Sequence, residues 1–135
     1  MRRSGPPPDD GVSGRRDRFE SFRRFRHERD RLLAFLAERR IGGVVFLSGD
    51  RHLAELIRHD RDGLPPLWEL TSSPLAAGLT SPGVRALVTP QRIAACVDQC
   101  NYGVVAWDPV AGALALAIHG EDGQEVFRQV VEIPR

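Results

Sequence analysis

The stretch GVVAWDPVAGALALAIHGEDGQEVFRQVVEI, residues 103–133, contains three β-prone runs separated by turn-forming segments. The runs are GVVAWD, ALALAIHG and EVFRQVVEI, and the segments between them include PVAG and EDG. Short runs rich in Val, Ile and aromatic residues, bounded by Gly, Pro and Asp, are typical of strands joined by tight turns. The sequence therefore predicts an antiparallel meander of three strands.

Upstream of the meander, the sequence indicates one helix and two further strands. From Asp17, apolar residues recur at spacings of three and four among Arg and Glu, which predicts an amphipathic helix with Asp17 as its N-cap and Gly42 and Gly43 as its stop. The following GVVFLSGD is apolar on both faces, which is typical of a buried strand at a central position of a sheet. A second short strand is expected from Leu67 to Leu70, after a proline turn.

The segment between this second strand and the meander predicts a loop and then a short helix. PLAAGLTSPGV is rich in small residues, and Thr89 followed by Pro90 resembles an N-cap and a first helical position. Apolar residues and cysteines from Ile93 onward would share one side of this helix. Cys96 and Cys100 have no second cysteine pair, so a zinc site would need His or acidic ligands from elsewhere. Two ordinary reduced thiols are the alternative.

The composition limits the class of protein. A chain of 135 residues with 41% hydrophobic content can bury one modest core, which we expect within residues 17–135, whereas residues 1–16 predict a disordered tail. The 19 basic and 18 acidic residues give a formal charge of +1, which argues against a general attraction to nucleic acid. No long apolar run follows the twin arginine near the N-terminus, so the sequence predicts no membrane span, no export signal and a cytoplasmic location.

Asp50 and His52 follow the expected strand GVVFLSG and are the candidate metal ligands. In an extended chain, side chains two positions apart point the same way, so the two would leave the strand side by side with Arg51 turned away. A carboxylate beside an imidazole at the carboxyl end of a buried strand suits a divalent or trivalent metal. The alternative is a Ser-Gly-Asp turn followed by a surface histidine.

Three motifs, VVFLSGDRHLAEL, PLWELTSSPL and NYGVVAWD, occur in this order, and together they resemble the C-terminal part of the alkaline phosphatase D (PhoD-like) family of calcineurin-like metallophosphatases. The similarity covers roughly residues 18–133. It implies a four-layered α/β/β/α fold and a phosphomonoesterase or phosphodiesterase with a metal pair, iron and calcium, between two sheets. Members of the family are often exported.

The resemblance also assigns expected roles to residues of this chain. Asp50 and His52 fall on the family's last metal-ligand motif, while Arg51 and Glu55 are candidates for contacting the phosphate and for supporting the ligands. The family's earlier motifs, which supply the remaining ligands, would lie upstream of the first residue. A metal pair needs about six or more ligands in total, and the sequence offers only His59, His119 and Glu55 as unaligned extras. We therefore expect a C-terminal segment that is inactive alone and needs an N-terminal partner chain.

A second interpretation is a small α/β interaction module without catalysis. The two-sided hydrophobicity of GVVFL demands cover on both faces, and one helix can cover only one of them. A partner chain or a second copy, in a homo-oligomer, would cover the other. Nucleic-acid binding through the Arg-rich helix is disfavoured, because interleaved aromatic residues and a recognised motif are missing.

Overall fold

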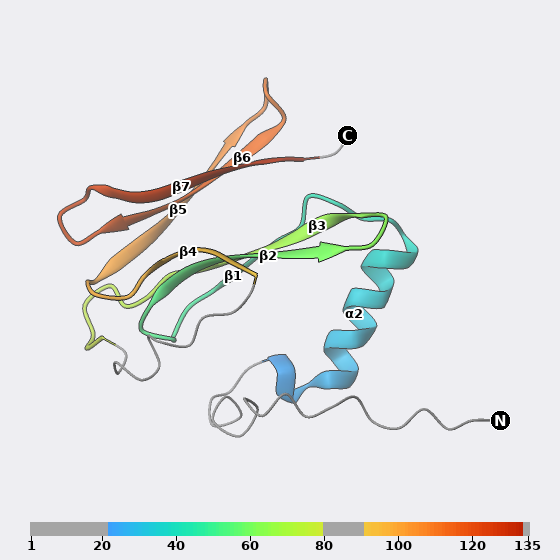
Figure 1. The fold of residues 1–135 in the computed structure, drawn as a ribbon, viewed down its shortest axis with the longest axis horizontal. Coiled ribbons are helices and arrows are strands. Elements are labelled where there is room, and N and C mark those ends of the chain that lie inside the picture. Colours follow the sequence, from blue (N-terminus) through green and yellow to red (C-terminus); the bar gives the residue numbers. More distant parts are fainter. Residues whose placement is uncertain (1–21, 80–90, 134–135) are drawn as a thin grey trace. The chain divides into compact units, whose positions relative to one another are not determined.

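The structure is a computed structural model of the chain, and it describes residues 22–79 and 91–133. The chain divides into two compact units, Met1–Arg39 and Arg40–Arg135. The described part of the first contains one α-helix, and the second contains two β-sheets (Figure 1). The expected disordered tail, the N-cap Asp17 and the Thr89–Pro90 helix start lie outside the described residues. No helix in the described ranges has the length and apolar character needed to cross a membrane.

The helix α2, Arg26–Glu38, follows a single 3-10 turn, η1, Phe22–Arg24. The prediction of one continuous helix through this stretch is wrong at Phe25, which lies between the two and provides no side-chain cap for α2. The helix ends before the expected glycines, because Arg40 already adopts a left-handed backbone conformation with φ of 52°. Leu36 is the buried residue of α2, as expected for one apolar side of an amphipathic helix.

The first sheet has four strands in the order β1-β3-β2-β4. Strand β1 runs parallel to β3, whereas β2 pairs antiparallel with both β3 and β4. Strands β2 and β3 form a hairpin closed by Asp62 and Gly63, and Gly63 has the positive φ, 64°, for which Asp-Gly turns are favoured. The strands are β1 Val45–Ser48, β2 Ala54–Arg61, β3 Leu64–Thr71 and β4 Arg92–Cys96.

Strand β1 does not occupy the central position that its apolar run predicts. Among the described strands it pairs only with β3, and it therefore forms an edge of the sheet. Leu47 is 65% exposed, so one face of this strand lacks the cover that a central strand has. The expected strand around Leu67 to Leu70 is confirmed, and β3 extends it in both directions.

Strands β2 and β4 were not predicted. Charged residues interrupt β2, yet the sheet buries Glu55 completely by pairing it with arginines from two other segments. The predicted helix from Ile93 is wrong, because β4 alternates between more and less exposed residues up to the buried Cys96, as a half-buried strand does.

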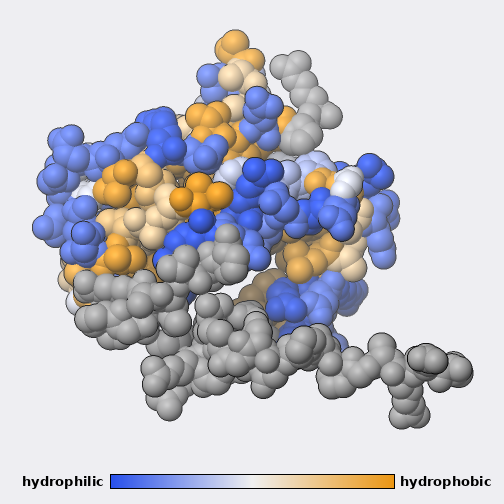
Figure 2. Space-filling view, viewed as in Figure 1, coloured by the Kyte–Doolittle hydropathy of each residue, from blue (hydrophilic) through white to orange (hydrophobic). Residues whose placement is uncertain are grey.

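The second sheet, here called the meander sheet, confirms the three predicted antiparallel strands. Their order is β5-β6-β7, with bounds β5 Asn101–Asp108, β6 Ala113–Gly120 and β7 Glu125–Glu132. Residues that alternate along β6 face opposite sides of the sheet, so Leu116 and Ile118 are fully buried on one side. The β5–β6 turn exposes 89% of Val110, and Figure 2 shows hydrophobic surface at the tip of this hairpin.

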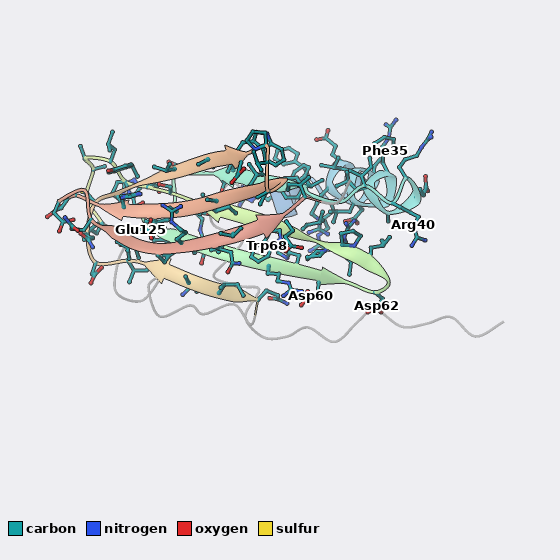
Figure 3. All side chains as sticks on the ribbon, turned by 90° about the horizontal axis from the view of Figure 1, so that it is seen from above. Phe35, Arg40, Asp60, Asp62, Trp68 and Glu125 are labelled. Atoms are coloured by element: carbon teal, nitrogen blue, oxygen red, sulfur yellow. The ribbon has the colours of Figure 1, made fainter. Side chains whose placement is uncertain are left out.

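One hydrophobic core joins the two sheets. Leu56, Trp68 and Leu70 of the first sheet pack in the same cluster as Leu116 and Ile118 of the meander sheet. Trp68, labelled in Figure 3, belongs to this cluster and is 7% exposed. Burial of these side chains is the main stabilising term of the second unit. The described fold is thus mixed α+β and consists mostly of sheet.

Candidate functional site

The loop after β1, residues 49–53, carries the two candidate metal ligands. Asp50 has φ of 63° and His52 has φ of 55°, so both adopt the left-handed conformation, which is uncommon for residues other than glycine. The backbone N–H of Arg51 donates to the Gly49 carbonyl at 2.8 Å, which tightens the turn. The sequence predicts that Asp50 and His52 leave an extended strand side by side. The premise of an extended backbone is wrong, because both residues adopt the left-handed conformation.

The backbone and the ring of His52 both make hydrogen bonds. Its backbone N–H donates to Ser73 Oγ at 2.8 Å, and its ring Nδ1 is hydrogen-bonded to the Gly78 carbonyl oxygen. A carbonyl oxygen only accepts, so Nδ1 carries the proton, and the neutral ring then has its lone pair on Nε2. Metal-binding histidines commonly donate their second N–H to a backbone carbonyl, which fixes the tautomer and the ring orientation. Nε2 of His52 is thus the ring nitrogen with a lone pair that could accept a hydrogen bond or bind a metal ion.

The Asp50 carboxylate is exposed at the same turn. Within residues 22–79 and 91–133, no hydrogen bond or ion pair involves it. An exposed carboxylate retains all of its acceptor positions, and carboxylate oxygens suit hard cations such as calcium. The donor set of the loop, one carboxylate and one imidazole, therefore fits part of a metal site.

Glu55, Arg51 and Arg92 form an ion-pair cluster beside this loop. The Glu55 side chain is fully buried, one of its carboxylate oxygens pairs with Arg51, and the other accepts from Arg92 Nε at 2.9 Å and Nη2 at 2.6 Å. An unpaired carboxylate at this depth would cost several kcal/mol, and the two guanidinium groups offset that cost. The cluster has a formal charge of +1, and Arg51, 45% exposed, is the member with the largest access to solvent.

Asn101 is a member of the site region that sequence reasoning missed. It is 2% exposed at the start of β5, its Oδ1 accepts from Ser72 Oγ at 3.1 Å, and its Nδ2 donates to the Ser73 carbonyl at 2.8 Å. Since Ser73 Oγ also accepts the His52 N–H, Asn101 connects the meander sheet to the ligand loop. At Gly103 an added Cβ would lie 3.2 Å from Ser72 Cβ, so the glycine permits this close approach. The only sequence signal was an Asn opening a strand-like run.

The remaining histidines lie on other elements, His27 on α2, His59 on β2 and His119 on β6. His59 Nε2 is 3.3 Å from Glu69 Oε2, and His119 stacks on Tyr102 with ring centroids 5.2 Å apart. In the two described ranges, no group of three or more His, Cys, Asp or Glu residues is arranged to hold a metal ion. The unaligned extras His59, His119 and Glu55 therefore do not complete a site with Asp50.

The cysteines are free thiols in different surroundings. Cys96 is buried in the core between the sheets, and Cys100 is partly exposed. Burial, followed by the nearby Asp98 carboxylate, raises the pKa of the Cys96 thiol. A buried thiol with a raised pKa is a poor nucleophile and a poor metal ligand, because both roles need the thiolate.

Comparisons with protein-family models, curated proteins and solved structures give no match for this chain. The resemblance to PhoD-like phosphatases therefore stays a prediction from the quoted motifs. A functional proposal rests on the loop geometry and on the chemistry of its side chains.

Proposed function

We propose that this chain is the C-terminal segment of a metal-dependent phosphoesterase of the PhoD-like type, and that Asp50 and His52 are two of its metal ligands. The observation that carries the proposal is the hydrogen bond between His52 Nδ1 and the Gly78 carbonyl, because it leaves Nε2 as the metal-binding nitrogen. The left-handed conformations of Asp50 and His52 support it as well, since such backbone strain is concentrated at functional sites.

The proposal includes the family's iron and calcium pair and its four-layered α/β/β/α architecture. When bound, such a metal pair polarises phosphoryl oxygens and lowers the pKa of water. Imidazole suits iron and carboxylate suits calcium, which agrees with the donors of the 49–53 loop. We place the remaining ligands outside the described residues. The isolated chain is then expected to hydrolyse phosphate esters inefficiently.

Arg51 and Glu55 have complementary roles in this proposal. The Arg51 guanidinium lies between the two ligand residues in sequence and is partly exposed, so it is suited to bind the phosphoryl oxygens of the substrate. Glu55 holds Arg51 from the buried side, which limits the conformations of that long side chain. Glu55 is accordingly a positioning residue.

A titration with Mn²⁺ tests the metal ligands without requiring hydrolysis. Mn²⁺ binds carboxylate and imidazole donors, and its unpaired electrons broaden the NMR signals of nearby amides. We expect broadening centred on residues 49–53, and we expect Asp50→Ala and His52→Ala each to weaken binding at least tenfold. His59→Ala is the matched control, because His59 is a partly exposed histidine on β2 and should leave binding unchanged. Equal binding by wild type and His52→Ala contradicts the proposal.

The second candidate function is that of an interaction module without catalysis. The observation that favours it is the exposed Leu47 on the edge strand β1, which presents to a partner an apolar side chain and backbone groups that no other described strand pairs with. A non-catalytic module requires no metal. Localised Mn²⁺ binding that depends on His52 therefore favours the phosphoesterase, and its absence favours the module.

A further inference from the structure

Strand β5 forms an exposed edge of the meander sheet. It pairs with β6 in continuous register from Asn101 to Asp108, and no described strand lies on its other side. Every residue of β5 after Asn101 is exposed. Half of the backbone N–H and C=O groups of such a strand point away from the sheet, and they are free to pair with another strand.

This edge lacks the features that normally prevent strand pairing. No charged residue and no proline occurs between Asn101 and Asp108, and the register with β6 has no bulge. The opposite edge strand, β7, carries Glu125, Arg128 and Glu132, and its pairing with β6 contains a register shift. In the first sheet, the edge strand β4 begins at Arg92 and its pairing with β2 is also irregular. Charges and bulges of this kind are how proteins protect sheet edges.

Apolar side chains extend from both faces of the β5 edge. Tyr102 and Val104 lie on one face and are 40% and 38% exposed, while Val105 and Trp107 lie on the other and are 43% and 53% exposed. A partner strand would cover side chains on both faces and would satisfy the backbone groups at the same time. Such a partner must itself be apolar on both faces and carry no charge along the contact.

We propose that β5 pairs antiparallel with β5 of a second copy of this chain, so that two meander sheets form one continuous six-stranded sheet. The edge fits a second copy because residues 102–107 carry no charge on either strand, whereas each of the described edges β4 and β7 would bring charges against it. The described edge β1 is also uncharged, but its four residues cannot match the eight residues of β5. A two-fold axis perpendicular to the sheet keeps equivalent faces together.

The residue sizes along β5 also match under this two-fold symmetry. With Val104 on the axis, Tyr102 lies opposite Ala106 on one face, and Gly103 lies opposite Val105 on the other. In these two pairs a larger side chain meets a small residue, which allows close packing across an antiparallel pair. The proposal uses no residue of the 49–53 loop, so its failure leaves the metal-ligand proposal unaffected.

Sedimentation equilibrium of the full chain tests this interface. We expect twice the 15.0 kDa mass of the chain for the wild type, and the monomer mass for Val104→Lys, which places a charge on the axis. Val130→Lys is the matched control, because Val130 is an exposed valine on the other edge strand of the same sheet, and this variant should remain dimeric. Circular dichroism should show that both variants stay folded.

A monomeric wild type across the concentration range overturns the proposal, as does a dimer that persists in Val104→Lys or one that Val130→Lys also dissociates. The register has its own test, because Val104→Cys places two thiols opposite each other at the axis. We expect oxidation to join two chains at position 104, and a dimer that cannot be joined there contradicts this register.

Discussion

The Glu55 carboxylate on β2 and the Arg92 guanidinium on β4 are joined across two neighbouring strands by hydrogen bonds of 2.9 Å from Nε and 2.6 Å from Nη2. Glu55 is fully buried and also pairs with Arg51, so a single carboxylate ties the ligand loop to the edge strand β4. The cluster therefore links the stability of the first sheet to the conformation of the candidate site.

Replacing Glu55 should destabilise the protein strongly. In Glu55→Gln the buried negative charge is lost while both arginines keep theirs, and we expect the free energy of unfolding to fall by about 3 kcal/mol. Urea unfolding followed by circular dichroism measures this change. Glu125→Gln is the control, because Glu125 forms an exposed pair with Arg128 and should change stability little. Similar effects for the two variants would show that the Glu55 cluster is not a buried, mutually dependent network.

Two glycines with almost the same backbone conformation should respond differently to a methyl group. Gly43 and Gly63 have φ of 68° and 64°, but an added Cβ at Gly43 would lie 2.8 Å from Ile133 Cγ2, whereas nothing lies within 4 Å at Gly63. We expect Gly63→Ala to cost about 1 kcal/mol from backbone strain alone. Gly43→Ala should cost about 1–3 kcal/mol more, because the stiff Ile133 side chain must move.

The difference between the two alanine variants is the quantity to measure, by thermal or urea unfolding of both under identical conditions. Equal losses of stability would mean that Ile133 yields to the methyl group without cost, and that the contact between the chain near Gly43 and the end of β7 is loose.

The two cysteines should differ in reactivity and in their effect on alkaline stability. Burial raises the pKa of the Cys96 thiol, so iodoacetamide should modify Cys100 first in the folded protein and reach Cys96 only after unfolding. Mass spectrometry of the labelled peptides gives the order. Faster labelling of Cys96 in the folded chain would contradict its placement in the core.

The raised pKa also sets the sign of a pH effect. The folded state holds the Cys96 proton more tightly than the unfolded chain does, so the resulting stabilisation is complete below the pKa of the unfolded thiol. It is lost as the pH rises from about 8.5 through the folded-state pKa. Cys96→Ala should therefore lose less stability than the wild type between pH 8 and pH 10. Parallel pH profiles for the two proteins would count against a perturbed thiol.

The sequence nominates the residues of the candidate site but does not predict their geometry. Asp50 and His52 stand out in sequence because a carboxylate and an imidazole follow an apolar strand, and Arg51 and Glu55 are close to them in the chain. Their actual arrangement depends on hydrogen bonds to distant segments, such as the one from His52 Nδ1 to the Gly78 carbonyl. Contacts of this kind leave no periodic signal in the sequence.

The sequence by itself determined the meander sheet, because alternating apolar residues and tight turns are local signals that strands β5, β6 and β7 follow without help from the rest of the chain. It also indicated the apolar strand around Leu67 to Leu70 and a helix that includes Leu36. Only the tertiary structure decided that β1 lies at an edge, that β2 and β4 are strands, and that Asp50 and His52 take left-handed conformations. The physical reason is that strand order and the burial of a charge such as Glu55 depend on partners far away in the chain, and a local pattern of residues does not contain those partners.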